Sequence, residues 1–189
     1  MKATNRIYTV SDLDGKDFED IFFESCKFTG DIKFVNFNNC KFIDCDVAGA
    51  LFNITSFTKC TFPGSKLSNI DFADIRIKDC DFSNAVMENC IFQKILTKNE
   101  VKKLELKGTI FNKTNLKNSA FIFCNLEKVN FTGSDLSDVV FERCTLKETK
   151  LSGCNINGTS FENCNIYKTI LDVSGFISYG SSKGFTLSN

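Results

Sequence analysis

The chain has 189 residues, in which 23 Lys and Arg balance 23 Asp and Glu, and it carries 21 Phe, 10 Cys, one Pro, no Trp and no His. Without histidine, the composition excludes Ser-His and Cys-His catalytic pairs, His-based metal motifs and the usual near-neutral general base. The balanced charge argues against a broadly basic nucleic-acid binder. No stretch reaches the roughly 18 apolar residues of a membrane helix, and the start lacks the apolar core of a signal peptide.

Residues 1–15 precede the regular part of the sequence and are predicted to form an N-terminal cap. Within them, residues 6–10 are predicted to be a short strand. Such a strand would cover the unpaired backbone groups that an open sheet end exposes.

From residue 16 to residue 176, large apolar side chains recur every five positions, apart from a four-residue step between Phe28 and Ile32 and a 14-residue step between Phe92 and Leu106. The longest run comprises Leu106, Phe111, Leu116, Phe121, Leu126, Phe131, Leu136, Phe141, Leu146, Leu151, Ile156, Phe161, Ile166, Leu171 and Phe176. A period of five fits neither a helix nor a strand, so the chain must turn a corner every five residues. A second, usually small residue lies two positions before each large one, and residues two apart in extended chain point to the same side. Each pentapeptide therefore gives one large and one small side chain to a common interior.

All ten cysteines fall in this small slot: Cys26, Cys40, Cys45, Cys60, Cys80, Cys90, Cys124, Cys144, Cys154 and Cys164. Buried free cysteine behaves as a small hydrophobe, and we interpret these residues as interior filler. Cysteines that run along one side do not converge on a metal, and their parallel Cβ atoms are too far apart for easy pairing. A reduced, cytoplasmic protein is expected.

Several segments, among them Cys45-Asp-Val-Ala-Gly, Cys80-Asp-Phe-Ser-Asn and Ser134-Asp-Leu-Ser-Asp, resemble the repeats of the pentapeptide-repeat family. The resemblance implies an all-β fold, a right-handed parallel quadrilateral β-helix of about eight coils with four pentapeptides in each. Equivalent positions of successive coils would then stack. Phe42, Phe62 and Phe82 would form one inner ladder, and Phe121, Phe141 and Phe161 another.

The register is unclear over residues 93–105, where we predict an irregular excursion with a helical turn near residues 99–106; the alternative is a continuous but poor coil. Residues 177–189 are predicted to be a C-terminal tail. Gly175, Gly180 and Gly184 suggest a loose end, and no amphipathic helix is expected after the last coil.

Two groups of charged residues are candidates for chemistry. The carboxylate pairs Asp71 with Asp74 and Asp135 with Asp138 could serve acid-base chemistry only in a cleft, and on a convex rod we interpret them as solvated corners. Lys107, Lys128, Lys147 and Lys168 recur on one face and could track phosphates, but the nearby Glu105, Glu127 and Glu148 favour a mixed-charge surface. We predict no catalytic, cofactor-binding or metal-binding residues.

Apolar residues at outward positions are the most informative signal for function. Ala120, Ile122, Phe123 and Val140 form one predicted group, and Phe34, Leu51 and Ile54 form another near the other end. A contiguous exposed apolar patch predicts a protein-binding surface. The alternative is that the N-terminal segment or the 93–105 excursion covers them.

The sequence therefore favours a non-enzymatic bacterial solenoid that binds another protein, without membrane or direct nucleic-acid contact, as a monomer or an end-to-end dimer. The resemblance offers a second hypothesis, a DNA mimic that binds gyrase and confers quinolone resistance or toxin immunity. Members of that group are expected to be strongly negative and to dimerise through C-terminal elements. The zero formal net charge and the absence of a predicted C-terminal helix favour the first hypothesis.

Overall fold

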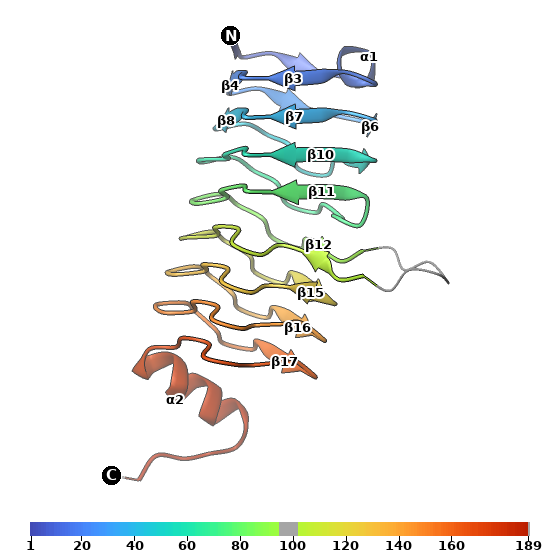
Figure 1. Ribbon diagram of the computed structural model, residues 1–189. Helices are drawn as coiled ribbons and strands as arrows, with labels where there is room; N and C mark the ends of the chain where they lie inside the picture. Colours follow the sequence, from blue (N-terminus) through green and yellow to red (C-terminus); the bar gives the residue numbers. More distant parts are fainter. Residues whose placement is uncertain (95–101, 189) are drawn as a thin grey trace.

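The chain winds into a four-sided parallel β-solenoid of about eight turns, as seen in a computed structural model that describes residues 1–94 and 102–188 (Figure 1). The two termini lie at opposite ends of the rod. Strands pair with strands one turn away, so that Phe57 faces Phe37 on one side and Ile77 on the other. The parallel β-helix predicted from the repeat is confirmed.

Each turn passes through four sides in a fixed order. The first side holds β1 (Lys2–Thr4), β4 (Phe22–Glu24) and β8 (Lys41–Ile43), and the second holds β2 (Ile7–Tyr8) and β5 (Lys27–Phe28). The third, which we name the β14 side, holds β6 (Asp31–Lys33), β9 (Leu51–Asn53), β12 (Ile91–Phe92), β14 (Ala120–Ile122), β16 (Val140–Glu142) and β17 (Ser160–Glu162). The fourth, the β10 side, holds β3 (Asp17–Glu19), β7 (Asn36–Asn38), β10 (Thr55–Thr58), β11 (Ile75–Lys78), β13 (Leu104–Glu105) and β15 (Cys124–Asn125).

The core consists of stacked phenylalanine rings. Phe42, Phe62 and Phe82 stack with centroids 4.9 and 4.7 Å apart, as the pentapeptide register predicts. Phe121, Phe141 and Phe161 form the second predicted ladder, with spacings of 5.2 Å. Offset stacking of this kind adds to the hydrophobic gain of burying each ring. Each turn therefore covers the rings of the one before it, which makes neighbouring turns mutually dependent.

The register shifts where the sequence analysis placed an excursion. The hydrogen-bonded corner side chains Asn69 and Asn89 are separated by 20 positions, whereas Asn89 and Asn118, the next pair in the same column, are separated by 29. Nine additional residues are therefore inserted, and the alternative of a continuous coil is wrong. Most of the excursion, residues 95–101, lies outside the described residues. The predicted helical turn is wrong at its C-terminal end, because Leu104–Glu105 form strand β13.

The N-terminal segment already pairs, strand by strand, with the next turn of the solenoid. The strand predicted at residues 6–10 is present only over Ile7–Tyr8, as β2, because Val10 already belongs to a helix. The strand β1 before it pairs with β4. Helix α1 (Val10–Leu13) follows and buries Leu13 completely. The boundary predicted at residue 15, between an N-terminal cap and the repeats, rests on the sequence pattern alone. Strand pairing already begins at Lys2.

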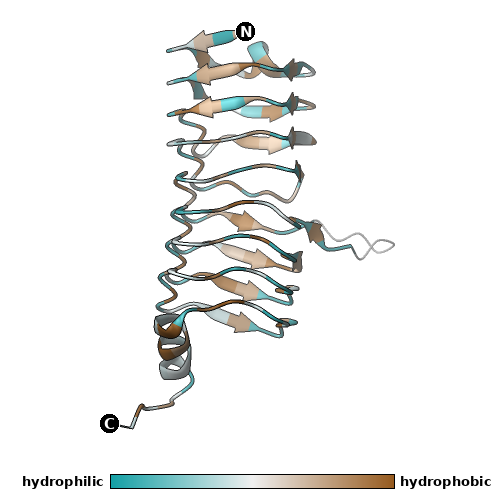
Figure 2. Cartoon of the chain, turned by 60° about the vertical axis from the view of Figure 1, so that its left-hand side comes forward, coloured by the Kyte–Doolittle hydropathy of each residue, from teal (hydrophilic) through white to brown (hydrophobic). Residues whose placement is uncertain are grey.

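A helix closes the C-terminal end, so the expectation that no helix follows the last coil is wrong. Helix α2 (Val173–Ser182) begins at Asp172, whose carboxylate accepts a hydrogen bond from the Gly175 amide at 2.8 Å. Gly175 is buried, and a Cβ there would lie 2.9 Å from the Leu171 side chain. This glycine therefore permits close packing and is not a sign of a loose tail. Figure 2 shows α2 directly beyond the last coil, with hydrophobic stretches along it.

Two classes of feature are missing from the described part of the chain. Neither helix there is long and apolar enough to cross a membrane. Within residues 1–94 and 102–188, no group of three or more His, Cys, Asp or Glu side chains is arranged to hold a metal ion.

Candidate protein-interaction surface

The residues predicted to bind a partner lie on the β14 side and on the corner where it meets the β10 side. At this corner, one residue connects a strand of the β14 side to the chain of the β10 side. This residue is Phe34 after β6, Ile54 after β9 and Phe123 after β14. We name this column of corner residues the shared edge. Phe34 and Ile54 occupy it in successive turns, because the Phe34 amide donates to the carbonyl of Asn53.

The three apolar residues of the shared edge have an unusual backbone conformation. Phe34, Ile54 and Phe123 have φ values of 55°, 49° and 53°, in the left-handed region that disfavours side chains with bulk near the backbone. Among the described residues, 21 non-glycine positions have positive φ, and the other 18 are polar or charged, mostly Asn, Asp and Lys. Among these 21 positions, apolar residues therefore occur only at the shared edge.

The group near the N-terminal end is open to solvent. Phe34, Leu51 and Ile54 are 58%, 62% and 63% exposed. The N-terminal segment therefore does not cover them, which answers the alternative raised from the sequence for this group. Exposed apolar side chains that share one side of a protein are typical of binding surfaces.

The second group is more enclosed. Val140 is 38% exposed and faces Ala120 as its strand partner, whereas Ala120, Ile122 and Phe123 are half-buried. The Phe123 ring lies between Lys103 and Arg143, whose cationic groups are 5.5 and 4.9 Å from its centroid. The end of the excursion thus covers Phe123 in part, and cation–π contacts hold it there.

Sequence reasoning missed one member of this surface. Ile91 is 38% exposed and faces Ala120 across the insertion. The signal was present in the repeat, because Ile91, Ala120 and Val140 each immediately precede a buried phenylalanine.

The first carboxylate of each pair accepts hydrogen bonds within its own turn. Asp71 accepts a hydrogen bond from the Ala73 amide at 2.9 Å, and Asp135 accepts from both the amide and the hydroxyl of Ser137. Although partial burial raises the pKa of Asp135, hydrogen bonds from Ser137 and Asn155 lower it below its usual value overall. A carboxyl held ionised in this way is unsuited to act as a general acid.

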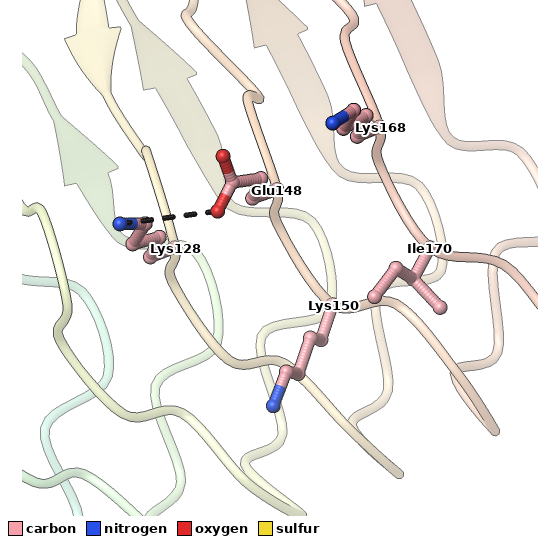
Figure 3. A pocket seen from close by; sticks show the side chains of 5 residues that line it. All are labelled: Lys128, Glu148, Lys150, Lys168 and Ile170. Carbon is pink, nitrogen blue, oxygen red and sulfur yellow. Dashed lines mark ion pairs between the residues drawn. The ribbon is translucent and has the colours of Figure 1, made fainter.

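The recurring lysines alternate with glutamates along the rod. Glu127 lies 3.2 Å from Lys107 and 3.7 Å from Lys147, and Lys128 lies 3.8 Å from Glu148. Figure 3 shows Lys128, Glu148 and Lys168 on successive turns, around a shallow depression that Lys150 and Ile170 complete. The mixed-charge interpretation fits this arrangement better than a phosphate-tracking stripe.

The ten cysteines are all free thiols, and eight of them are buried. Burial raises the pKa of Cys90 to about 12 and that of Cys45 to about 11. The Cys90 thiol lies 3.0 Å from the carbonyl of Leu67 in the preceding turn. Cys45 and Cys90 are therefore poor nucleophiles that fill the interior.

Comparison with known proteins agrees with the repeat pattern. A family model described as "Pentapeptide repeats (8 copies)" matches residues 35–73 and 55–93, and one described as "Pentapeptide repeat region" matches residues 94–171. Together they span more than half of the chain. A search of curated protein sequences found no match.

Two solved structures of one protein share the fold at low sequence identity. A trypsin-treated form of QnrB1, a plasmid-mediated fluoroquinolone resistance protein, gives a TM-score of 0.71 at 16% identity over 100% of this chain and 99% of that one. Full-length QnrB1 gives 0.58 at 19% identity, covering 97% of each chain. HetL, a pentapeptide repeat protein involved in heterocyst differentiation regulation in the cyanobacterium Nostoc, gives 0.38 at 13% identity over 90% and 87%.

Proposed function

The chain belongs to the pentapeptide-repeat family, and from that premise we propose that it is a non-enzymatic solenoid whose function is to bind another protein. The proposed binding surface is the β14 side with the shared edge. It comprises Phe34, Leu51 and Ile54 near the N-terminal end, and Ala120, Ile122, Phe123 and Val140 further along the rod.

The observation that carries this proposal is that apolar residues occupy corner positions with left-handed backbone. Left-handed backbone costs roughly 1–2 kcal/mol for a residue with a Cβ, and more than the average for β-branched Ile54. Asn, Asp and Gly occupy many equivalent corners elsewhere in the rod. Ile54 and Phe34 bring no compensating burial, because both side chains are more than half exposed. Strain kept without a packing gain supports a role in binding.

A second candidate function is protection of gyrase from fluoroquinolones. It is favoured by the superposition of the whole chain on QnrB1, a fluoroquinolone resistance protein. Helix α2 removes one of the two sequence-based reasons against this candidate. The other reason, a formal net charge of zero, still argues against mimicry of DNA, because a duplex is uniformly negative.

We also propose a bacterial cytoplasmic setting. Ten free thiols in one small chain fit a reducing compartment. The assembly state stays a prediction of a monomer or an end-to-end dimer, which sedimentation equilibrium would distinguish.

The proposal is tested by affinity capture from an extract of the source organism. The bait is the intact chain or a double variant, Phe34→Asn with Ile54→Asn, which removes the apolar side chains at corners that suit Asn. Lys59→Asn is the matched control, because Lys59 has the same backbone conformation (φ 53°) at another corner. We expect the partner to be retained by the control and lost by the double variant. Equal capture by all three baits would refute the proposed surface.

The gyrase candidate is tested separately, by adding the purified protein to a gyrase supercoiling reaction inhibited by a fluoroquinolone. Restored supercoiling at near-stoichiometric protein would favour that candidate over a general partner. No restoration at a large excess would exclude it.

A further inference from the structure

Two cysteines stack on the β10 side at the C-terminal end of the rod. Cys144 and Cys164 occupy the same small slot in successive turns, since the Asn165 amide donates to the Cys144 carbonyl at 2.8 Å. Figure 1 shows β16 and β17, the strands that precede them, on neighbouring turns. Each thiol donates to the carbonyl of a phenylalanine 23 positions earlier, Cys144 to Phe121 at 3.2 Å and Cys164 to Phe141 at 3.4 Å. The two sulfurs therefore point the same way, one turn apart.

The spacing of one turn suits a bridging ion better than a disulfide. Neighbouring parallel strands lie roughly 4.8 Å apart, and Phe141 and Phe161 in the same two turns stack at 5.2 Å. A disulfide would need the two side chains to approach much more closely. A bond between a thiolate and a metal is roughly 2.3 Å long, so an ion midway between two sulfurs fits a separation of about 4.6 Å.

The number of ligands selects the kind of ion. Structural zinc takes four ligands, and within residues 1–94 and 102–188 no group of three or more His, Cys, Asp or Glu is arranged to hold a metal. Thiolates are soft ligands and favour soft ions such as Cu(I). Closed-shell monovalent ions of this class accept two ligands in a line, so two sulfurs complete their coordination.

This pair of cysteines can be reached from solvent. All ten cysteines lie in the described part of the chain, and Cys164 is one of the two that are partly exposed. By contrast, the ladder formed by Cys40, Cys60 and Cys80 is buried throughout. An ion that arrives at Cys164 needs to reach only one buried thiol, that of Cys144, to be held at both ends.

A cationic side chain lies near the two sulfurs. A hydrogen bond with the Cys144 thiol raises the pKa of Cys164, whereas the Lys103 ammonium favours its thiolate form. Lys103 is held beside this slot by a hydrogen bond to the hydroxyl of Thr145, at 2.5 Å. Two thiolates around one monovalent cation carry one negative charge overall, which this lysine would offset.

We propose that Cys144 and Cys164 bind one soft, closed-shell monovalent cation of the Cu(I) class, held in a line between their sulfurs. Binding replaces two S–H bonds with two S–metal bonds and releases two protons, and no oxidation state changes. The ion joins the last turn to the one before it, so its binding stabilises the C-terminal end of the rod. This inference goes beyond the proposed function and does not depend on it.

The test follows alkylation of the partly exposed cysteines by iodoacetamide, with Ag(I) nitrate in chloride-free buffer as the probe. Cys154 is the internal control, because it is also partly exposed but stacks on Ser134, whose carbonyl accepts from the Asn155 amide at 3.0 Å. We expect one equivalent of Ag(I) to slow alkylation of Cys164 at least tenfold and that of Cys154 less than twofold, as measured by peptide mass spectrometry. Equal protection of both thiols would overturn the two-sulfur site.

A variant removes the second sulfur. Cys144→Ser should abolish the protection of Cys164, and it should fold, because Ser134 fills the equivalent slot of another side. Cys90→Ser, which removes a buried thiol from a different column, should leave the protection intact. Circular dichroism checks the fold of both variants. Protection that persists in Cys144→Ser would refute the site.

Native mass spectrometry gives a readout that does not depend on a buried substitution. At one equivalent of Ag(I), Cys164→Ser should retain at least tenfold less of the ion than Cys154→Ser, and equal retention would count against the proposal. Protection of Cys164 by Zn(II) as strong as that by Ag(I) would overturn the class of ion. A protein that loses two hydrogen atoms and binds no silver would show that the pair forms a disulfide and is not a metal site.

Discussion

The rings of Phe92 and Phe121 stack with centroids 4.3 Å apart and an interplanar angle of 1°, although the whole insertion separates them in the chain. Both side chains are fully buried. Phe121→Ala should therefore lower the free energy of unfolding by about 3–5 kcal/mol, through lost burial and the cavity left behind. Urea denaturation followed by circular dichroism measures this change.

Phe176→Ala is the matched control for that variant. Phe176 lies in α2 and is 62% exposed, so its removal should change the unfolding free energy by no more than about 0.5 kcal/mol. A loss for Phe121→Ala as small as that of the control would contradict the stacked core.

Replacing Ile54 by asparagine should leave the fold at least as stable. Asn tolerates the left-handed backbone, so relief of strain offsets the small burial of the Ile54 side chain, and we expect an unfolding free energy that is unchanged or higher by up to about 1 kcal/mol. Thermal and urea denaturation report this value. A loss above about 1 kcal/mol, the scale of the strain itself, would mean that Ile54 has a packing role.

Substitutions at two glycines would distinguish the cost of backbone strain from the cost of steric crowding. Gly108 and Gly158 have φ values of 73° and 71°, but a Cβ at Gly108 would meet open space, whereas one at Gly158 would collide with the Asp138 carboxylate. Gly108→Ala should cost roughly 1–2 kcal/mol of unfolding free energy, and Gly158→Ala should cost more. Adding Asp138→Gly to Gly158→Ala should restore the smaller cost. Equal costs for the two single variants would show that the carboxylate moves aside freely.

Stability should fall at alkaline pH because of the buried thiols. Burial raises the pKa of Cys90 from 9.0 to about 12, so the folded chain disfavours the thiolate that the unfolded chain forms above pH 9. The stabilisation is complete below pH 9 and is lost as the pH rises toward 12, by up to about 1.4 kcal/mol per pH unit for each such thiol. Cys90→Ala should therefore flatten the fall measured by urea denaturation between pH 9 and 11.

Ser134→Ala provides the control for the pH series. Ser134 occupies the same small slot and is buried, but its hydroxyl does not titrate in this range. Its removal should lower stability by a similar amount at every pH. A slope that changes equally in both variants would assign the alkaline loss to other groups.

The solenoid could be predicted from the sequence because one short pattern specifies every turn. Phe62 and Phe82 stack as expected, since residues in the same slot of successive turns must meet in a four-sided coil. The shortened step between Phe28 and Ile32 is also present, because Lys27 bridges to Asp46 and not to Val47, which an uninterrupted repeat would place opposite it.

The rest depends on contacts that no local pattern encodes. Helix α2 was missed because Gly175 is a poor helix former by itself, and its use as a close contact for Leu171 appears only in three dimensions. The outward position of Ile54 was predictable, but its strained backbone was not, since Asn or Gly usually marks such a corner.

The ladders that remain closed across the insertion constrain how this rod can change over evolution. Pairing of Asp81 with Ile110, Val86 with Asn115 and Ile91 with Ala120 fixes the register before and after the additional residues. Because Phe92 and Phe121 stack directly across the insertion, we expect this corner to suit the grafting of foreign loops onto a rigid scaffold.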